Sequence, residues 1–118
     1  MDYFIITDWD ASYADPIRVE AGAPVKLTGR QEEWDGYRWL WAVSATGLEG
    51  WIPDSLITEG ADGPCAREDY SAVELTCRAG DRVSGGRHMN GWVWCHAQSG
   101  CAGWVPRQHL RPVEHGRA

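Results

Sequence analysis

The chain has 118 residues and a formal net charge of −6, from 17 acidic and 11 basic side chains. An acidic balance argues against a nucleic-acid backbone or an anionic membrane as the main partner. No apolar run approaches the roughly 20 residues needed to span a bilayer. The opening stretch, MDYFIITDWD, lacks the basic segment and long apolar core of a secretory signal. We therefore expect a cytoplasmic protein that binds neither nucleic acid nor membrane.

The first half predicts short β-strands. Its apolar residues alternate with polar ones, Gly, Asp and Pro punctuate the runs, and no segment sustains the 3.6-residue period of a helix. The residues expected to face the core are Ile5, Ile17, Val19, Val25, Leu27, Ala42, Ile52 and Ile57.

The stretch WLWAVSATGLEGWIP, residues 39–53, predicts a hairpin, because turn-forming residues and two glycines separate two apolar runs. Trp41 and Trp51 should then lie opposite each other, with Trp39 on the same face. Ala42 and Ile52 should point to the core. We expect a strip of three tryptophans on the side of the sheet away from the core.

Residues 58–64, TEGADGP, are small and polar and end in proline, as a linker does. This divides the chain into a first domain over 1–58, a linker over 59–63, a second domain over 64–113 and a tail over 114–118.

The second half repeats the hairpin motif as WVWCHAQSGCAGWVP, residues 92–106. Six residues match at a constant offset of 53: Trp39, Trp41, Gly47, Gly50, Trp51 and Pro53 correspond to Trp92, Trp94, Gly100, Gly103, Trp104 and Pro106. The core of this half is expected to contain Ala66, Leu75, Cys77, Val83, Cys95, Val105 and Leu110. Such an internal repeat indicates two related structural units. Their charges differ, at −7 for residues 1–60 and +1 for residues 61–118, so we expect different ligand preferences.

All four cysteines lie in the second half. Their spacing contains no C-x2-C knuckle, so we expect reduced thiols and no metal site or other cofactor. Cys77 and Cys95 are interpreted as core residues.

The repeats resemble Src-homology-3 domains in two tandem copies. The second copy carries the resemblance in AREDYSAVELTCRAGDRV, NGWVWC and GWVPRQHL, and the first, more divergent copy in IITDWDASYADPIRVEAG, YRWLWA and GWIPDSLI. The resemblance implies an all-β fold of two small five-stranded barrels. We take the chain to be of a bacterial type, because no catalytic domain is attached.

The resemblance also implies binding of an extended, proline-rich or basic peptide segment in shallow aromatic grooves. Carried over by position, the groove of the second copy contains Tyr70, Glu74, Trp92, Pro106 and His109. The groove of the first copy contains Trp9, Asp15, Glu32, Glu33, Trp39 and Pro53. The acids would steer a basic peptide toward Trp9 and Trp39. His109 replaces a groove tyrosine, so it either makes binding sensitive to pH or is an exposed residue with no role.

Two other functions stay open. The tryptophan strips would pack internally or form a homodimer in a structural protein, and they would form an aromatic cage in a reader of small cationic or cell-wall ligands. We expect no enzyme activity, because the sequence holds no nucleophile elbow, phosphate loop or recognisable carboxylate pair.

Overall fold

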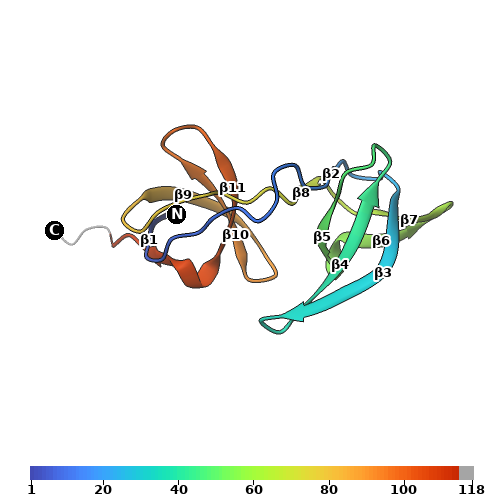
Figure 1. Ribbon diagram of the computed structural model, residues 1–118, viewed down its shortest axis with the longest axis horizontal. Helices are drawn as coiled ribbons and strands as arrows, with labels where there is room; N and C mark the ends of the chain where they lie inside the picture. The colour runs from blue at the N-terminus through green and yellow to red at the C-terminus, as the bar shows by residue number, and fades with distance from the viewer. Residues whose placement is uncertain (115–118) are drawn as a thin grey trace. The chain divides into compact units, whose positions relative to one another are not determined.

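A computed structural model describes residues 1–114 of the chain, which are built from strands and two single turns of 3-10 helix (Figure 1). The predicted all-β class is confirmed. The strands are β1 (Asp2–Ile5), β2 (Arg18–Val19), β3 (Val25–Trp34), β4 (Tyr37–Ser44), β5 (Glu49–Pro53), β6 (Ile57–Gly60), β7 (Gly63–Ala66), β8 (Tyr70–Ser71), β9 (Arg82–Met89), β10 (Trp92–Ala97), β11 (Ala102–Pro106) and β12 (Leu110–Pro112). The turns are η1 (Asp54–Leu56) and η2 (Arg107–His109).

The chain forms two compact units that do not follow sequence order. Unit 1 combines Met1–Ser12 with Glu74–Ala118, and unit 2 is the continuous segment Tyr13–Val73. The N-terminal arm, residues 1–12, therefore folds with the second half of the chain.

Unit 1 contains a five-stranded sheet in the order β11-β10-β9-β1-β12. The N-terminal strand β1, drawn in blue, lies between β9 and β12 from the other end of the sequence (Figure 1). In this register Tyr3 is opposite both Val83 and Pro112, and Ile5 is opposite Leu110. The arm thus completes the sheet of unit 1.

Unit 2 contains the three-stranded sheet β3-β4-β5 and the pairs β6-β7 and β2-β8. Strand β7 occupies the position that β1 has in unit 1, because Ala66 is opposite Ile57 just as Ile5 is opposite Leu110. The opening strand of the first repeat, β1, therefore pairs with the end of the second repeat, and the opening strand of the second repeat, β7, pairs with the end of the first. We call this the exchange of arms.

This arrangement differs from the division into domains at 1–58 and 64–113. The expected linker, 59–63, lies within and between the paired strands β6 and β7, where Glu59 is opposite Pro64 and Gly60 is opposite Gly63. The seven small and polar residues from 58 to 64 thus form a hairpin instead of a spacer. Within residues 1–114 no sheet closes on itself, so the expected pair of five-stranded barrels is not what the strand pairing shows.

The predicted core is confirmed at most positions. The buried ones are Ile5, Ile17, Val19, Val25, Ala42, Ile52, Ala66, Leu75, Cys77, Val83, Cys95, Val105 and Leu110, whereas Leu27 and Ile57 are half-buried. The sequence patterns did not assign Tyr3 or Leu56 to the core, yet both are buried. Burying apolar area stabilises each unit by about 25 cal/mol per Å².

Both predicted hairpins are present. Trp41 is opposite Trp51 and Trp94 is opposite Trp104, with ring centroids 5.0 and 5.3 Å apart in edge-to-face contact. The pairs differ in exposure, since Trp104 is buried and the other three rings are half-buried. None of the helical turns within residues 1–114 has the length and apolar character to cross a membrane.

Candidate functional site

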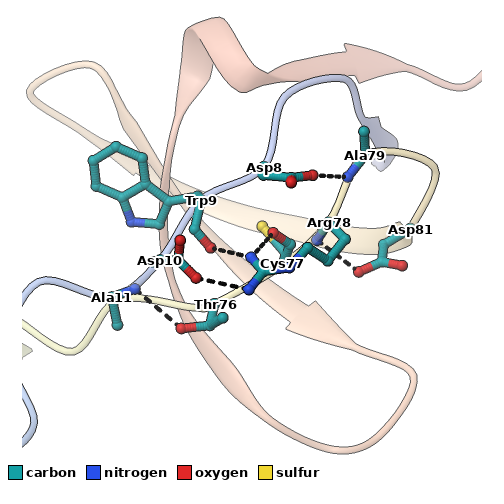
Figure 2. Close-up of polar contacts among 9 residues, drawn as sticks. All are labelled: Asp8, Trp9, Asp10, Ala11, Thr76, Cys77, Arg78, Ala79 and Asp81. Carbon is teal, nitrogen blue, oxygen red and sulfur yellow. Dashed lines mark hydrogen bonds and ion pairs between the residues drawn. The ribbon is translucent and has the colours of Figure 1, made fainter.

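The arm is fastened to the rest of unit 1 by a short ladder of backbone hydrogen bonds (Figure 2). Trp9 N–H donates to the Cys77 carbonyl at 2.9 Å, and Cys77 N–H donates to the Trp9 carbonyl at 2.8 Å. Ala11 N–H donates to Oγ1 of Thr76 at 3.0 Å. These bonds join two segments that are more than 60 residues apart in sequence.

Charged side chains reinforce the ladder. Ala79 N–H donates to the Asp8 carboxylate at 2.8 Å, and Arg78 forms an ion pair with Asp10 at 2.8 Å (Figure 2). The hydrogen bond from Arg78 to Asp10 raises the pKa of the guanidinium, so Arg78 keeps its charge. The ion pair is exposed, and exposed pairs contribute little stability, so it serves mainly to align the arm.

Glu74 holds the end of the arm through one carboxylate oxygen, Oε1. That oxygen accepts hydrogen bonds from Trp9 Nε1 at 3.0 Å, from Ser12 N at 3.0 Å and from Ser12 Oγ at 3.1 Å. Hydrogen bonds to a charged acceptor are stronger than neutral ones. Glu74 therefore fixes the indole orientation of Trp9 and closes the loop at Ser12.

The Trp9 ring, held by this carboxylate, lies against two other aromatic rings. The Trp9 ring lies edge-on to Trp92 and to His109, with centroids 5.3 Å apart in both pairs. All three side chains are half-buried, and Pro106 is buried opposite Trp92 in the β10–β11 pair. We call Trp9, Glu74, Trp92, Pro106 and His109 the aromatic site.

The His109 ring is positioned by the arm as well. Its Nδ1 lies 3.2 Å from the carbonyl oxygen of Thr7, which is a hydrogen bond in the tautomer that carries hydrogen on Nδ1. A neutral His109 then presents Nε2 as an acceptor.

Three other predicted site residues, Trp39, Pro53 and Tyr70, belong to unit 2. Trp39, half-buried, is opposite Pro53 on one side and Glu32 on the other. Tyr70 is buried, and its hydroxyl donates to the carbonyl of Trp51 at 3.2 Å. Tyr70 is therefore anchored in unit 2, whereas Trp92 belongs to unit 1.

The acids predicted for the first groove lie on different segments of unit 2. Asp15 is exposed and pairs with Arg18 at 3.5 Å, while Glu32 and Glu33 lie exposed on β3. The compact units divide the predicted site residues in another way than the two repeats do. Unit 1 contains Trp9, Glu74, Trp92, Pro106 and His109, and unit 2 contains Trp39, Pro53 and Tyr70.

Two features escaped the sequence patterns. We call the hydrogen bonds of Trp9 and Ser12 to Glu74, and of Ala11 to Thr76, the clasp. Ser12 and Thr76 belong to it, but serine and threonine in a loop carry no signal of such a role. Arg30 lies 4.9 Å from the ring centroids of both Trp41 and Trp51, in a region where β3 and β4 shift register. This strip thus holds a cation of its own chain.

Cys77 and Cys95 are buried as predicted, and burial is the main reason that the pKa of each thiol is raised, to about 12 for Cys95. High thiol pKa values are the opposite of what a nucleophilic cysteine needs. Within residues 1–114 no cluster of three or more His, Cys, Asp or Glu side chains is arranged to hold a metal ion.

Comparison with known proteins gives one result. Residues 62–113 match the variant SH3 domain, where SH3 denotes Src homology 3. No curated protein and no solved structure matches the chain. The match starts in unit 2 and ends in unit 1, so it follows the sequence repeat and not the compact units.

Proposed function

We propose that the chain is a non-catalytic interaction protein whose aromatic site in unit 1 binds an extended peptide segment. SH3-like domains generally mediate protein–protein interaction, and the family match at residues 62–113 includes four of the five residues of the site. The fifth, Trp9, comes from the arm.

The observation that carries the proposal is that the half-buried ring of Trp9 lies against two other half-buried rings and is held by one carboxylate. Trp9 contacts both Trp92 and His109 edge-on and is oriented by Glu74. Rings that are held in place and partly open to solvent suit a preformed polyproline II segment, which loses little entropy on binding. The Glu74 carboxylate beside the rings favours a basic residue in the ligand.

A second site is proposed in unit 2, around Trp39 and Pro53. Unit 2 carries the whole net charge of the chain, because its eleven acids and five bases give −6 while unit 1 has six of each. Glu32 is opposite Trp39 in the β3–β4 pair. These charges support a basic segment as the ligand of this second site.

The proposal is tested by selecting peptides from a displayed library of proline-rich and arginine-containing sequences against the full chain. The dissociation constant of a selected peptide is then measured for wild type, Trp92→Ala and Trp39→Ala. Losing a central aromatic contact typically costs about 2 kcal/mol, or roughly 30-fold in affinity.

Binding in unit 1 predicts this loss for Trp92→Ala and near wild-type affinity for Trp39→Ala, its match at the same repeat position. The reverse result assigns binding to unit 2. Unchanged affinity in both folded variants would remove the aromatic grooves as the binding sites.

A further inference from the structure

Unit 2 is inserted into unit 1 between the two segments that carry Trp9 and Glu74 of the aromatic site. The chain leaves unit 1 after Ser12 and returns at Glu74, and the 61 residues between them, Tyr13–Val73, form unit 2. Both residues at the junction belong to the clasp, because Glu74 accepts two hydrogen bonds from Ser12 and one from Trp9. The insertion therefore sits at the residues that orient Trp9.

Unit 2 holds its own two ends together. Ala72 N–H donates to the carbonyl of Ile17 at 2.9 Å, and Arg18 and Val19 are paired with Ser71 and Tyr70 in β2–β8. Only residues 13–16 and Val73 lie between these bonds and the Ser12–Glu74 clasp. A folded unit 2 thus acts as a short closed connection between Ser12 and Glu74.

We propose that the folding of unit 2 controls the peptide site of unit 1, an inference that rests on the proposed function for its binding consequence. When unit 2 unfolds, the connection becomes a flexible loop of 61 residues in place of about five. The probability of loop closure falls as the three-halves power of length, which makes the clasp about 40-fold harder to form. Trp9 then loses its orientation although the strands of unit 1 persist.

The same coupling works in the opposite direction. A partner that binds and stabilises folded unit 2 keeps the loop closed and so strengthens binding at the aromatic site. The folding of unit 2 and the binding at unit 1 are coupled by the free energy of closing the connection between Ser12 and Glu74.

The test is a urea titration of the full chain with the hydrogen exchange of individual amides followed by NMR. Ile52→Ala weakens unit 2 selectively, because Ile52 is fully buried in β5. Lys26→Ala, an exposed residue of the same unit, is the matched control. The amides of Trp9, Ser12 and Cys77 report the clasp, and those of β10 and β11 report the sheet of unit 1.

The inference predicts that in Ile52→Ala the clasp amides lose protection together with unit 2, at a lower urea concentration than the β10 and β11 amides. A disulfide between the paired positions, made by Arg18→Cys and Ser71→Cys with Cys65 and Cys101 changed to Ser, should separate the events. Arg18 and Ser71 lie opposite each other, next to the hydrogen-bonded residues Ile17 and Ala72. Such a pair, which is not itself hydrogen-bonded, has the short distance between Cα atoms that a disulfide requires. When the disulfide is formed before urea is added, the clasp amides should stay protected from exchange after unit 2 unfolds. When the disulfide is reduced, they should lose protection together with unit 2.

Clasp amides that follow β10 and β11 in every variant would overturn the inference, and so would a clasp that opens equally in the oxidised and reduced chains. The amide readout needs no ligand, so it stands even if no peptide binds and the proposed function fails. With a selected peptide, affinity at a urea concentration that melts unit 2 should be about 20-fold weaker for the reduced than for the oxidised chain, because the disulfide leaves about nine residues between Ser12 and Glu74 in place of 61.

Discussion

At the scale of single residues, the carboxylate of Glu74 is the most connected polar group of the aromatic site. It is half-buried and takes three hydrogen bonds on one oxygen. Glu74→Ala leaves these donors without their acceptor, so we expect unfolding in urea to show a loss of about 1–3 kcal/mol in unit 1. Glu74→Gln keeps an acceptor oxygen and should lose less. Equal losses in the two variants would show that the bonds from Trp9 and Ser12 contribute nothing.

The buried thiol of Cys95 gives a prediction on pH. Burial raises its pKa from the ordinary value of 9.0 to about 12 in the folded chain. Between these values the unfolded thiol has released its proton while the folded one keeps it, so the free energy of unfolding falls as pH rises from 9.0 toward about 12.

Replacing Cys95 with Ala should flatten this fall, as measured by urea unfolding at a series of pH values. Exposed Cys101 offers an independent check, because it should react with iodoacetamide long before Cys95 does. A Cys95→Ala chain with the same pH slope as wild type would contradict the assignment.

At the scale of elements, strand β11 packs closely against the loop of unit 1. A Cβ on Gly103 would lie 2.6 Å from backbone atoms of Glu74 and Leu75. Backbone moves less easily than a side chain, so Gly103→Ala should destabilise unit 1 by about 1–3 kcal/mol through overpacking. Gly86→Ala is the control, because its Cβ would meet only the Trp94 carbonyl oxygen, at 3.9 Å. Thermal unfolding of both variants makes the comparison, and equal midpoints would refute the close packing.

The elements themselves were largely predictable from the sequence. Alternation identified the strands and most of the core, and the repeat at an offset of 53 identified both hairpins with their tryptophan pairs. These features depend on local pattern and on the two-residue period of a strand.

The exchange of arms could not be predicted in this way. Ile5 paired with Leu110 and Ala66 paired with Ile57 satisfy the same apolar pattern that pairing within each repeat would satisfy. The choice depends on contacts between segments far apart in sequence, such as Asp8 with Ala79 and Ser12 with Glu74. Residue pattern therefore named these residues as candidates but placed Trp9 with the first repeat and Tyr70 with the second, whereas the compact units divide them the other way.

At the scale of the whole molecule, the net charge is concentrated in unit 2. Long-range attraction raises the association rate of an oppositely charged ligand and is screened by salt. For an arginine-containing peptide that binds unit 2, Glu32→Gln with Glu33→Gln should slow association and flatten its dependence on salt. Stopped-flow measurements at several salt concentrations provide the check. Unchanged kinetics would mean that these two acids only solvate the surface of β3.

The reading of the chain as a homodimerising structural protein predicts a different behaviour. Packing of the tryptophan strips between copies would give a mass that rises with concentration, whereas a binding module stays at one mass. Light scattering over a range of concentrations separates the two. Replacing Trp41 should change the result only if the strip forms an interface.

The central claim is that the arm and the second half of the chain build one peptide site in unit 1. The most direct test is an NMR titration of the full chain with a selected peptide, following the indole N–H signals of its eight tryptophans. The account predicts that the signals of Trp9 and Trp92 shift together with a single dissociation constant. A titration in which Trp92 shifts and Trp9 does not, or in which only tryptophans of unit 2 respond, would contradict it.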